Sequence, residues 1–352
     1  GRYLLKRPLG EGGMGTVYVA QRPGIERLFA VKVLKRELRG NELAFKRFQR
    51  EARVLSRLSH PHIVSVHDYG QTEDGFAYLA MEYLHGISLS DYVSHIPDRR
   101  LHLSQAVELI LQVTQALEYA HRLQVVHRDI KPPNILLTLQ DGDGDFVKVL
   151  DFGIARLVHQ EALTRVNDGI PGTPTYAAPE MFQGGDYLNP ALDMYAVGIM
   201  MFECIVGQPP FMGVDMRLMF QHQSEVPPLL SEKRRDVHIP RALDSLVAQL
   251  LGKEPQARPS AAAVTEQLMA IRPRLPPRSL QSILFMQTKL LSRPGTGNLE
   301  QPDEDSAAVL ITAQPVLHEL DSLESLLSQA GEGLAKQTRV VLRRLWAGKL
   351  PA

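Results

Sequence analysis

A short stretch in the middle of the chain, VVHRDIKPPNILL (residues 125–137), places polar side chains between two apolar runs. Asp129 carries a carboxylate that can accept a proton from a substrate hydroxyl. Lys131 can neutralise a phosphoryl group during its transfer, and Asn134 offers a neutral oxygen ligand for a hard cation such as Mg²⁺. These residue types together indicate phosphoryl transfer, if other segments supply a second metal ligand and a binding site for phosphate.

Two other segments supply such groups. KVLDFGIAR puts Asp151 at the end of an apolar strand, in position to hold a metal. LGEGGMGTVYVA spells G-x-G-x-x-G with Gly10, Gly12 and Gly15, and residues without side chains let backbone N–H groups approach phosphates closely. Dinucleotide folds share this spelling but need a helix after the glycines, whereas TVYVAQ is typical of a strand. The glycines are therefore predicted to lie in a hairpin that covers a nucleotide.

Lys32 lies inside an apolar strand, FAVKVL, where an unpaired charge would be costly. Its neighbours Ala30, Val31 and Val33 argue against an ordinary solvated lysine. The side chain therefore needs an anion. The sequence leaves two candidates open, which are the phosphate oxygens of a nucleotide and the carboxylate of Glu51 in FQREARVL.

The elements that must position these residues follow from the spacing of apolar residues. Alternation over residues 3–35 predicts three strands joined by turns, and residues 62–84 predict two more. Helical spacing over residues 42–58 predicts a helix between them. The N-terminal part is therefore expected to be an antiparallel sheet with one main helix.

The pattern changes in the second part of the chain. Residues 104–123 predict a long amphipathic helix with Ser104 as its N-cap, and the chain beyond residue 180 is mostly helical in pattern. The fold class is therefore α+β, with a small β-rich lobe followed by a larger, mostly helical lobe. Residues 82–90 form the junction, where pockets are favoured. DGDGD (141–145) is interpreted as a hairpin turn rather than a calcium loop.

Composition narrows the class of protein. The 352 residues are 44% hydrophobic, which is enough for one large two-lobed domain. Because 39 Lys and Arg balance 39 Asp and Glu, charge gives no support for a nucleic-acid partner. The single Cys204 excludes a disulfide framework and fits a cytoplasmic location. The most apolar stretch, residues 195–207, is too short to span a bilayer, so no membrane segment is expected within the chain, although an anchor outside it stays open.

The motifs taken in order resemble those of the eukaryotic-type (Hanks-type) protein kinases, over residues 3 to about 272. The glycine loop is followed by VK, HRD, DFG and AAPE, and the wording of these motifs is most similar to bacterial Ser/Thr protein kinases. The resemblance implies a two-lobed protein-kinase fold. It covers a kinase domain over 1–272 (N-lobe about 1–84, C-lobe about 85–272). Beyond it, Pro-rich and polar composition predicts a linker over 273–306, and helical spacing of leucines predicts a helical tail of unknown role over 307–352.

The resemblance also assigns chemical roles. Asp129 matches the catalytic base, and Lys131 matches the lysine that follows it. Asn134 and Asp151 match the metal ligands, and Thr173 by analogy bridges Asp129 and Lys131. The cofactors implied are ATP and Mg²⁺, with Mn²⁺ as a substitute.

The nucleotide site is implied in the same way. Lys32 matches the lysine that grips the α- and β-phosphates, with Glu51 as its partner. Met81 falls at the gatekeeper position, and residues 82–84 match the hinge whose backbone binds adenine. The residues expected to contact the nucleotide are Gly10, Glu11, Gly12, Gly13, Gly15, Val17, Ala30, Lys32, Glu51, Met81, Glu82, Leu84 and Leu136.

The function that the resemblance implies is a protein Ser/Thr kinase in signal transduction, which transfers the γ-phosphoryl group of ATP to protein hydroxyls. Lys131 and the GTPTY segment favour Ser/Thr over Tyr. Its partners are ATP and protein substrates, itself included, with a homodimer as the form for trans-autophosphorylation. The alternative is a catalytically silent pseudokinase scaffold, which predicts loss of Lys32, Asp129 or Asp151, and none is lost. A small-molecule kinase would lack the APE and GTPTY segments.

Several further contacts are implied by the family pattern. The expected spine that joins the lobes consists of Leu55, Val66, His127 and Phe152. Glu180 should pair with Arg258, and Asp193 should anchor the HRD segment. Arg128 before the base implies a phosphate on the activation segment, for which Thr164 is the nearest candidate. The sequence identifies neither the substrate nor the activating signal.

Overall fold

The structure, a computed structural model, describes residues 2–12, 15–34, 42–72, 74–140, 143–152, 174–183 and 189–277. The chain divides into two compact units, one formed by Gly1–Thr138 with Asp145–Pro277 and the other by Leu139–Gly144 with Arg278–Ala352. Nearly all described residues belong to the first unit. The linker predicted over 273–306 extends past them, and the tail predicted over 307–352 lies outside them.

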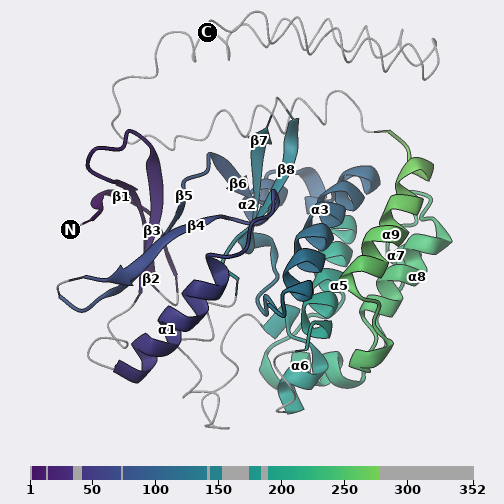
Figure 1. Ribbon diagram of the computed structural model, residues 1–352. Helices are drawn as coiled ribbons and strands as arrows, with labels where there is room; N and C mark the ends of the chain where they lie inside the picture. The colour runs from purple at the N-terminus through teal and green to yellow at the C-terminus, as the bar shows by residue number, and fades with distance from the viewer. Residues whose placement is uncertain are drawn as a thin grey trace, which may run out of the picture. The chain divides into compact units, whose positions relative to one another are not determined.

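The N-lobe is a five-stranded antiparallel sheet with one helix beside it (Figure 1). Its strand order is β1-β2-β3-β5-β4, and each neighbouring pair of strands is antiparallel. The elements are β1 (Leu4–Gly12), β2 (Gly15–Gln21), β3 (Leu28–Leu34), α1 (Glu42–Leu55), β4 (Val66–Gln71) and β5 (Ala77–Glu82). All five strands and the helix agree with the prediction from apolar spacing.

The glycine segment forms the end of the β1–β2 hairpin, as predicted. Gly12 is paired with Gly15 across the turn. Gly15 has φ +156, and a Cβ atom there would lie 2.1 Å from the carbonyl oxygen of Val33. Only glycine fits such a close approach of two strands. The register then places Gly10 opposite Val17, and Val17 opposite Lys32.

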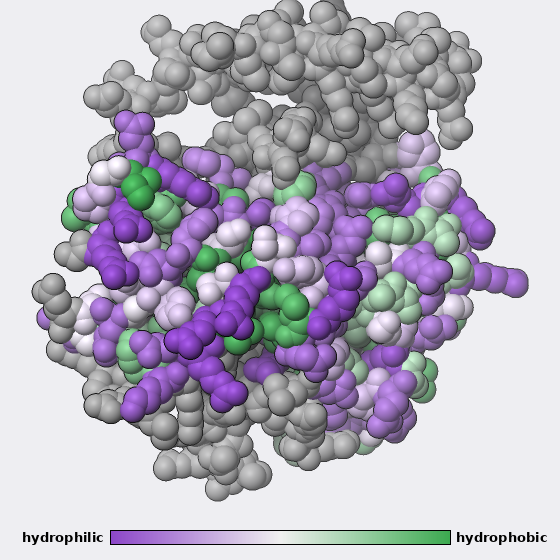
Figure 2. Space-filling model, viewed as in Figure 1, coloured by the Kyte–Doolittle hydropathy of each residue, from purple (hydrophilic) through white to green (hydrophobic). Residues whose placement is uncertain are grey.

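The side chains of helix α1 form one buried apolar face and one exposed charged face, with the period of the helix. Phe48 and Ala52 are buried, and α1 packs against β4. Lys46, Arg50 and Arg53 are exposed on the opposite side, where hydrophilic residues cover the α1 region (Figure 2). Burial of the apolar stripe holds the helix beside the sheet, because isolated helices of this length are marginal in water.

The C-lobe is built from helices that pack side by side, α3 against α5 and α9, and α5 against α8 (Figure 1). Every residue of α5 except Ala191 and Glu203 is buried, because the helix is apolar on all sides. It contains Cys204, which is buried. The helices are α2 (Leu89–Ser94), α3 (Leu103–Arg122), α5 (Ala191–Val206), α6 (Asp215–Ser224), α7 (Leu230–Lys233), α8 (Arg241–Leu250) and α9 (Ala261–Ile271).

One detail of α3 differs from the prediction. The helix begins at Leu103 with His102 as its N-cap residue, so the assignment of Ser104 as N-cap is wrong. Leu103 is buried and belongs to the apolar face, which extends the helix by a residue. The Ser104 hydroxyl lies 2.8 Å from Nδ1 of His102 instead of capping a backbone N–H.

A second, three-stranded sheet lies at the start of the C-lobe, in the order β6-β7-β8. Its strands are β6 (Gly86–Ser88), β7 (Ile135–Gln140) and β8 (Asp143–Val149). β7 and β8 are neighbours in this sheet, whereas residues 141 and 142, at the predicted hairpin turn DGDGD, lie outside the described residues. Among the helices in the described part of the chain, none has the length and apolar character needed to cross a bilayer.

Candidate active site

Asp129, Lys131 and Asn134 come together in the catalytic loop, residues 127–134, between α3 and β7. The carboxylate of Asp129 lies 2.9 Å from Nζ of Lys131 through Oδ1. Its Oδ2 accepts a hydrogen bond of 2.8 Å from Nδ2 of Asn134, which also donates to the Asp129 backbone carbonyl at 2.7 Å. Base, cation and amide are thus held as one group by short-range contacts.

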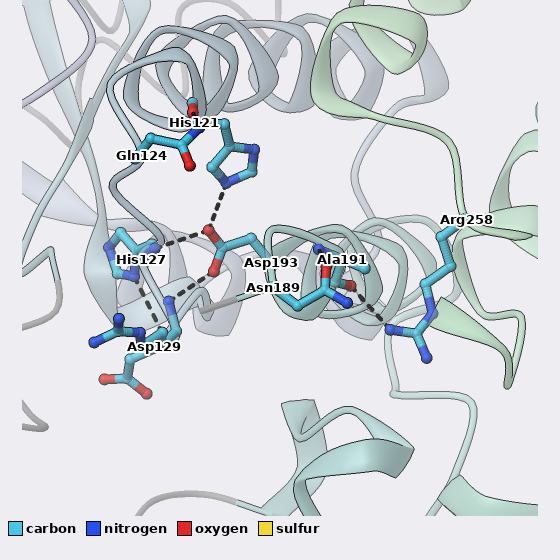
Figure 3. Close-up of polar contacts among 9 residues, drawn as sticks. His121, Gln124, His127, Asp129, Asn189, Ala191, Asp193 and Arg258 are labelled. Atoms are coloured by element: carbon cyan, nitrogen blue, oxygen red, sulfur yellow. Dashed lines mark hydrogen bonds and ion pairs between the residues drawn. The ribbon is translucent and has the colours of Figure 1, made fainter. Parts of the chain in front are cut away.

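Asp193, near the start of α5, fixes the beginning of this loop (Figure 3). Its buried carboxylate accepts hydrogen bonds from the backbone N–H groups of His127 (2.8 Å) and Arg128 (2.6 Å), and it contacts Nε2 of His121 at 2.8 Å. Burial by itself would raise the pKa of Asp193, but the hydrogen bond and charge of His121, with the loop's own groups, hold that pKa below its ordinary value. The loop is therefore tied to the core of the C-lobe.

The DFG segment meets the catalytic loop from the other side. Nε2 of His127 contacts the Leu150 carbonyl oxygen at 2.7 Å, and the rings of His127 and Phe152 lie 4.5 Å apart. Asp151 has φ +55 and Arg128 has φ +69, which are unusual values for residues other than glycine. Such backbone conformations persist only where the surroundings impose them, and they gather at functional sites.

Lys32 has a described anionic partner, and it is Asp151. The ammonium lies 2.9 Å from Oδ2 of Asp151, with the lysine side chain 6% and the carboxylate 32% exposed. The sequence offered phosphate or Glu51 for this role. Glu51 lies in α1 as expected, but its side chain is outside the described set. Asp151 was named as a metal ligand and not as the partner of Lys32.

The other predicted nucleotide residues line the sheet and the lobe junction. Ala30 of β3 pairs with the buried Met81 of β5, and Leu136 lies in β7 beside β6. Glu82 ends β5, and Leu84 follows two residues later. Gly10, Glu11 and Gly12 lie in β1, and Gly15 and Val17 in β2. Gly13 and the catalytic candidate Thr173 lie outside the described residues, as does Thr164.

Sequence reasoning missed one charged residue at this junction. Lys148 of β8 forms an ion pair with Glu82, at 2.8 Å between Nζ and Oε1. The signal was present, because Lys148 lies in the apolar strand FVKVL just as Lys32 lies in FAVKVL. A charge inside an apolar strand needs a partner in both cases.

The segment of residues 174–183, which contains the APE motif, is held to the C-lobe by two partly buried contacts. Glu180 and Arg258 form the predicted pair, with distances of 2.7 and 2.8 Å between the two carboxylate oxygens and the two terminal nitrogens. The Tyr176 hydroxyl donates to Oε2 of Glu203 in α5 at 2.5 Å. Burial raises the pKa of both Tyr176 and Glu203.

The comparisons with known proteins agree with this geometry. The family model described as "Protein kinase domain" matches residues 3–269. Serine/threonine-protein kinase pkn3 of Myxococcus xanthus is 39% identical over 277 residues, which are 77% of this chain and 50% of that protein. Serine/threonine-protein kinase PknB of Mycobacterium leprae is 33% identical over 87% of this chain and 48% of its own length. This chain therefore spans about half the length of these curated relatives.

Solved structures give the same answer. The crystal structure of the PknI kinase domain of Mycobacterium tuberculosis matches with a TM-score of 0.58 and 31% identity, over 76% of this chain and 95% of that one. Fold, site and sequence thus define a two-lobed protein-kinase domain. The chain belongs to the Hanks-type protein kinase family and is similar to its bacterial Ser/Thr members.

Proposed function

We propose that this chain is an active protein Ser/Thr kinase that transfers the γ-phosphoryl group of ATP to Ser or Thr hydroxyls of proteins, itself included. The observation that carries the proposal is that the catalytic loop and the Lys32–Asp151 pair bring a base, two cations and two oxygen ligands to one junction. A pseudokinase would be expected to lack one of these groups. Each of them is present.

Asp129 takes the proton of the acceptor hydroxyl. Lys131 and Asn134 hold its carboxylate from two sides, so the group has a fixed orientation. The carboxylate side chain is 24% exposed, which leaves an approach for a protein hydroxyl. A base positioned in this way contributes roughly 10²–10⁴-fold to the rate.

Lys32 and Lys131 balance the negative charge of the phosphates, Lys32 from the N-lobe sheet and Lys131 from the catalytic loop. Asn134 and Asp151 supply an amide oxygen and a carboxylate, which are ligands that Mg²⁺ prefers. Because Nδ2 of Asn134 already donates to Asp129, its Oδ1 is the atom that remains for a cation. Asn134 and Asp151 would hold Mg²⁺ here, and the bound ion would supply positive charge to neutralise the charge that develops on the transferred group.

The first test is phosphate transfer itself. Purified chain is incubated with radiolabelled ATP, Mg²⁺ and a generic Ser/Thr-containing protein, beside the D151N variant and a mock preparation. The expected result is incorporation by the wild type, with less than about 1% of it in D151N, because the variant loses the charged metal ligand. No incorporation by the wild type with either Mg²⁺ or Mn²⁺ would favour the scaffold instead.

The second test concerns the chain as its own substrate. Mass spectrometry before and after ATP, and again after phosphatase, locates phosphorylated residues, with Thr164 as the specific candidate. Trans-autophosphorylation between two copies predicts that the initial rate per molecule rises with protein concentration. A rate per molecule that stays constant would indicate transfer within one copy.

A further inference from the structure

The Glu82–Lys148 pair joins segments that are far apart in the sequence. Lys148 Nζ lies 2.8 Å from Oε1 of Glu82, with each side chain 13% exposed, and it also donates to the Ile63 carbonyl at 3.5 Å. The same Oε1 accepts a hydrogen bond of 2.8 Å from the backbone N–H of Ser65. The Glu82 backbone N–H donates to the Ser65 carbonyl at 3.0 Å. One carboxylate therefore connects β5, β8 and the segment between α1 and β4.

The connecting segment is itself bound to β8. The N–H of Val149 donates to the His62 carbonyl at 2.9 Å, and the N–H of Val64 donates to the Val149 carbonyl at 3.1 Å. Ile63 and Val149 form an isolated parallel bridge. The chain between α1 and β4 thus pairs with a strand of the C-lobe, next to Lys148.

Glu82 and Lys148 belong to two segments that are expected to contact opposite ends of a bound nucleotide. Glu82 ends β5 and begins residues 82–84, where the adenine edge is expected. Lys148 lies in β8, and Asp151 follows it by three residues, just after the end of that strand. The pair therefore bears on the distance between the hinge and the carboxylate that faces the phosphates.

Stability alone is a poor explanation for the pair. Two charges lose hydration when they are mostly buried, so an apolar pair of similar volume would stabilise the fold as well or better. What an ion pair adds is a fixed geometry between the groups that it joins. We propose that Glu82 and Lys148 are positioning residues for the nucleotide, which set the hinge in register with the DFG strand. This inference rests on the proposed function, since it assigns the nucleotide to this junction.

The test uses the full chain with E82Q, K148M and the double variant E82Q/K148M. Glutamine keeps an acceptor for the Ser65 N–H, and methionine keeps most of the lysine stem. The dissociation constant for the fluorescent analogue mant-ATP and the KM for ATP are expected to rise about three- to tenfold in each single variant. KM for an acceptor peptide stays unchanged. In the double variant these two constants are expected to be no higher than in the weaker-binding single variant, because each residue acts through the other.

The matched control is R272M, which breaks an exposed ion pair with Glu108 at 3.2 Å and leaves both constants unchanged. Nucleotide constants within about twofold of wild type in both single variants, or an effect in the double equal to the product of the singles, would overturn the proposal. A lower melting temperature without a change in nucleotide affinity would also overturn it. If the wild type binds mant-ATP but transfers no phosphate, the proposed function fails while the binding series still decides this inference.

Discussion

Lys32 and Asp151 lie 2.9 Å apart, which joins the third strand of the N-lobe to the residue that follows β8 by two positions. The lysine side chain is buried, and the carboxylate is one-third exposed. Both are groups that a nucleotide with its cation would contact, the lysine through phosphate and the carboxylate through the metal. In the described arrangement they neutralise each other. If the proposed function holds, we expect ATP binding to exchange this ion pair for two contacts with the ligand.

Replacing Lys32 by methionine should abolish transfer while the fold survives. The apolar stem can occupy the same space, and the remaining Asp151 carboxylate is exposed enough to be hydrated. The expected result is a loss of at least about 100-fold in kcat/KM, with a change of about 1 kcal/mol or less in the free energy of unfolding. A phosphate-transfer assay and urea denaturation measure the two quantities. Turnover near that of the wild type would contradict the assigned role.

Replacing Asp129 by asparagine should affect chemistry more than nucleotide binding. The amide keeps the shape of the side chain and can still accept from Lys131, but it loses the hydrogen bond from Asn134 and cannot take a proton. A single-turnover rate lower by about 10²–10⁴-fold is expected, with the dissociation constant for mant-ATP unchanged. The isosteric change is its own packing control. A variant that loses nucleotide affinity in proportion to rate would assign Asp129 to binding instead.

Replacing Asp193 by asparagine should destabilise the catalytic loop. The carboxylate serves donors from His121, His127 and Arg128, and an amide cannot accept from all of them. The free energy of unfolding at neutral pH should fall by about 2–5 kcal/mol. Because the pKa of Asp193 is lowered in the folded state, its contribution is present above about pH 4 and is lost as the pH falls further.

Urea denaturation of the wild type and of D193N, from neutral pH down to about pH 3, measures the free energy of unfolding of each protein. The difference between wild type and D193N should therefore narrow in acid. A difference that stays constant down to about pH 3 would show that the charge of Asp193 is not the source of its effect.

The elements of this fold could be predicted from the sequence because apolar spacing is a local signal. The β1–β2 hairpin and α1 follow from the period of their own residues. The contacts between lobes are not local. Lys32 meets Asp151, a residue 119 positions away, and this contact depends on how the DFG segment is oriented. Neither apolar spacing nor a motif encodes that orientation.

The Glu82–Lys148 pair escaped prediction for a related reason. The apolar strand around Lys148 indicates that the lysine needs an anionic partner, but it does not identify Glu82, which lies 66 positions away in the sequence. Only the pairing of residues 62–64 with Val149 brings the two side chains together and removes them from water. The wrong N-cap at Ser104 has a different cause. The local preference of serine for the N-cap position was outweighed by the burial of Leu103, with which the helix begins.

Replacing Arg258 by lysine should weaken the junction between the APE segment and the C-lobe. The guanidinium is fully buried and donates to both Glu180 oxygens and to the carbonyls of Ala191, Gly252 and Lys253. An ammonium cannot reproduce this planar set of donors. The free energy of unfolding should fall by about 3–5 kcal/mol in urea denaturation. R272K, at an exposed pair, is the control and should change it by less than about 0.5 kcal/mol.

Replacing His222 by asparagine should remove part of the acid sensitivity of the fold. The imidazole is buried beside the Phe182 and Phe211 rings, and its Nδ1 lies 2.9 Å from the hydroxyl of Tyr195. Burial, with a smaller effect of the Lys253 charge, lowers the pKa of His222 to about 4. The unfolded chain, in which histidine titrates near about 6.5, therefore binds more protons at intermediate pH.

The sign of the effect follows from that difference. The wild type should lose up to about 3 kcal/mol of folding stability through His222 as the pH falls from about 6.5 to about 4, because protonation favours the unfolded chain. Asparagine keeps an acceptor for the Tyr195 hydroxyl and does not titrate, so H222N should show a shallower decline than the wild type. Urea denaturation at several pH values measures both slopes. Parallel curves for the two proteins would mean that His222 is charged in the folded state or exchanges its proton without unfolding, and would contradict its burial as a neutral ring.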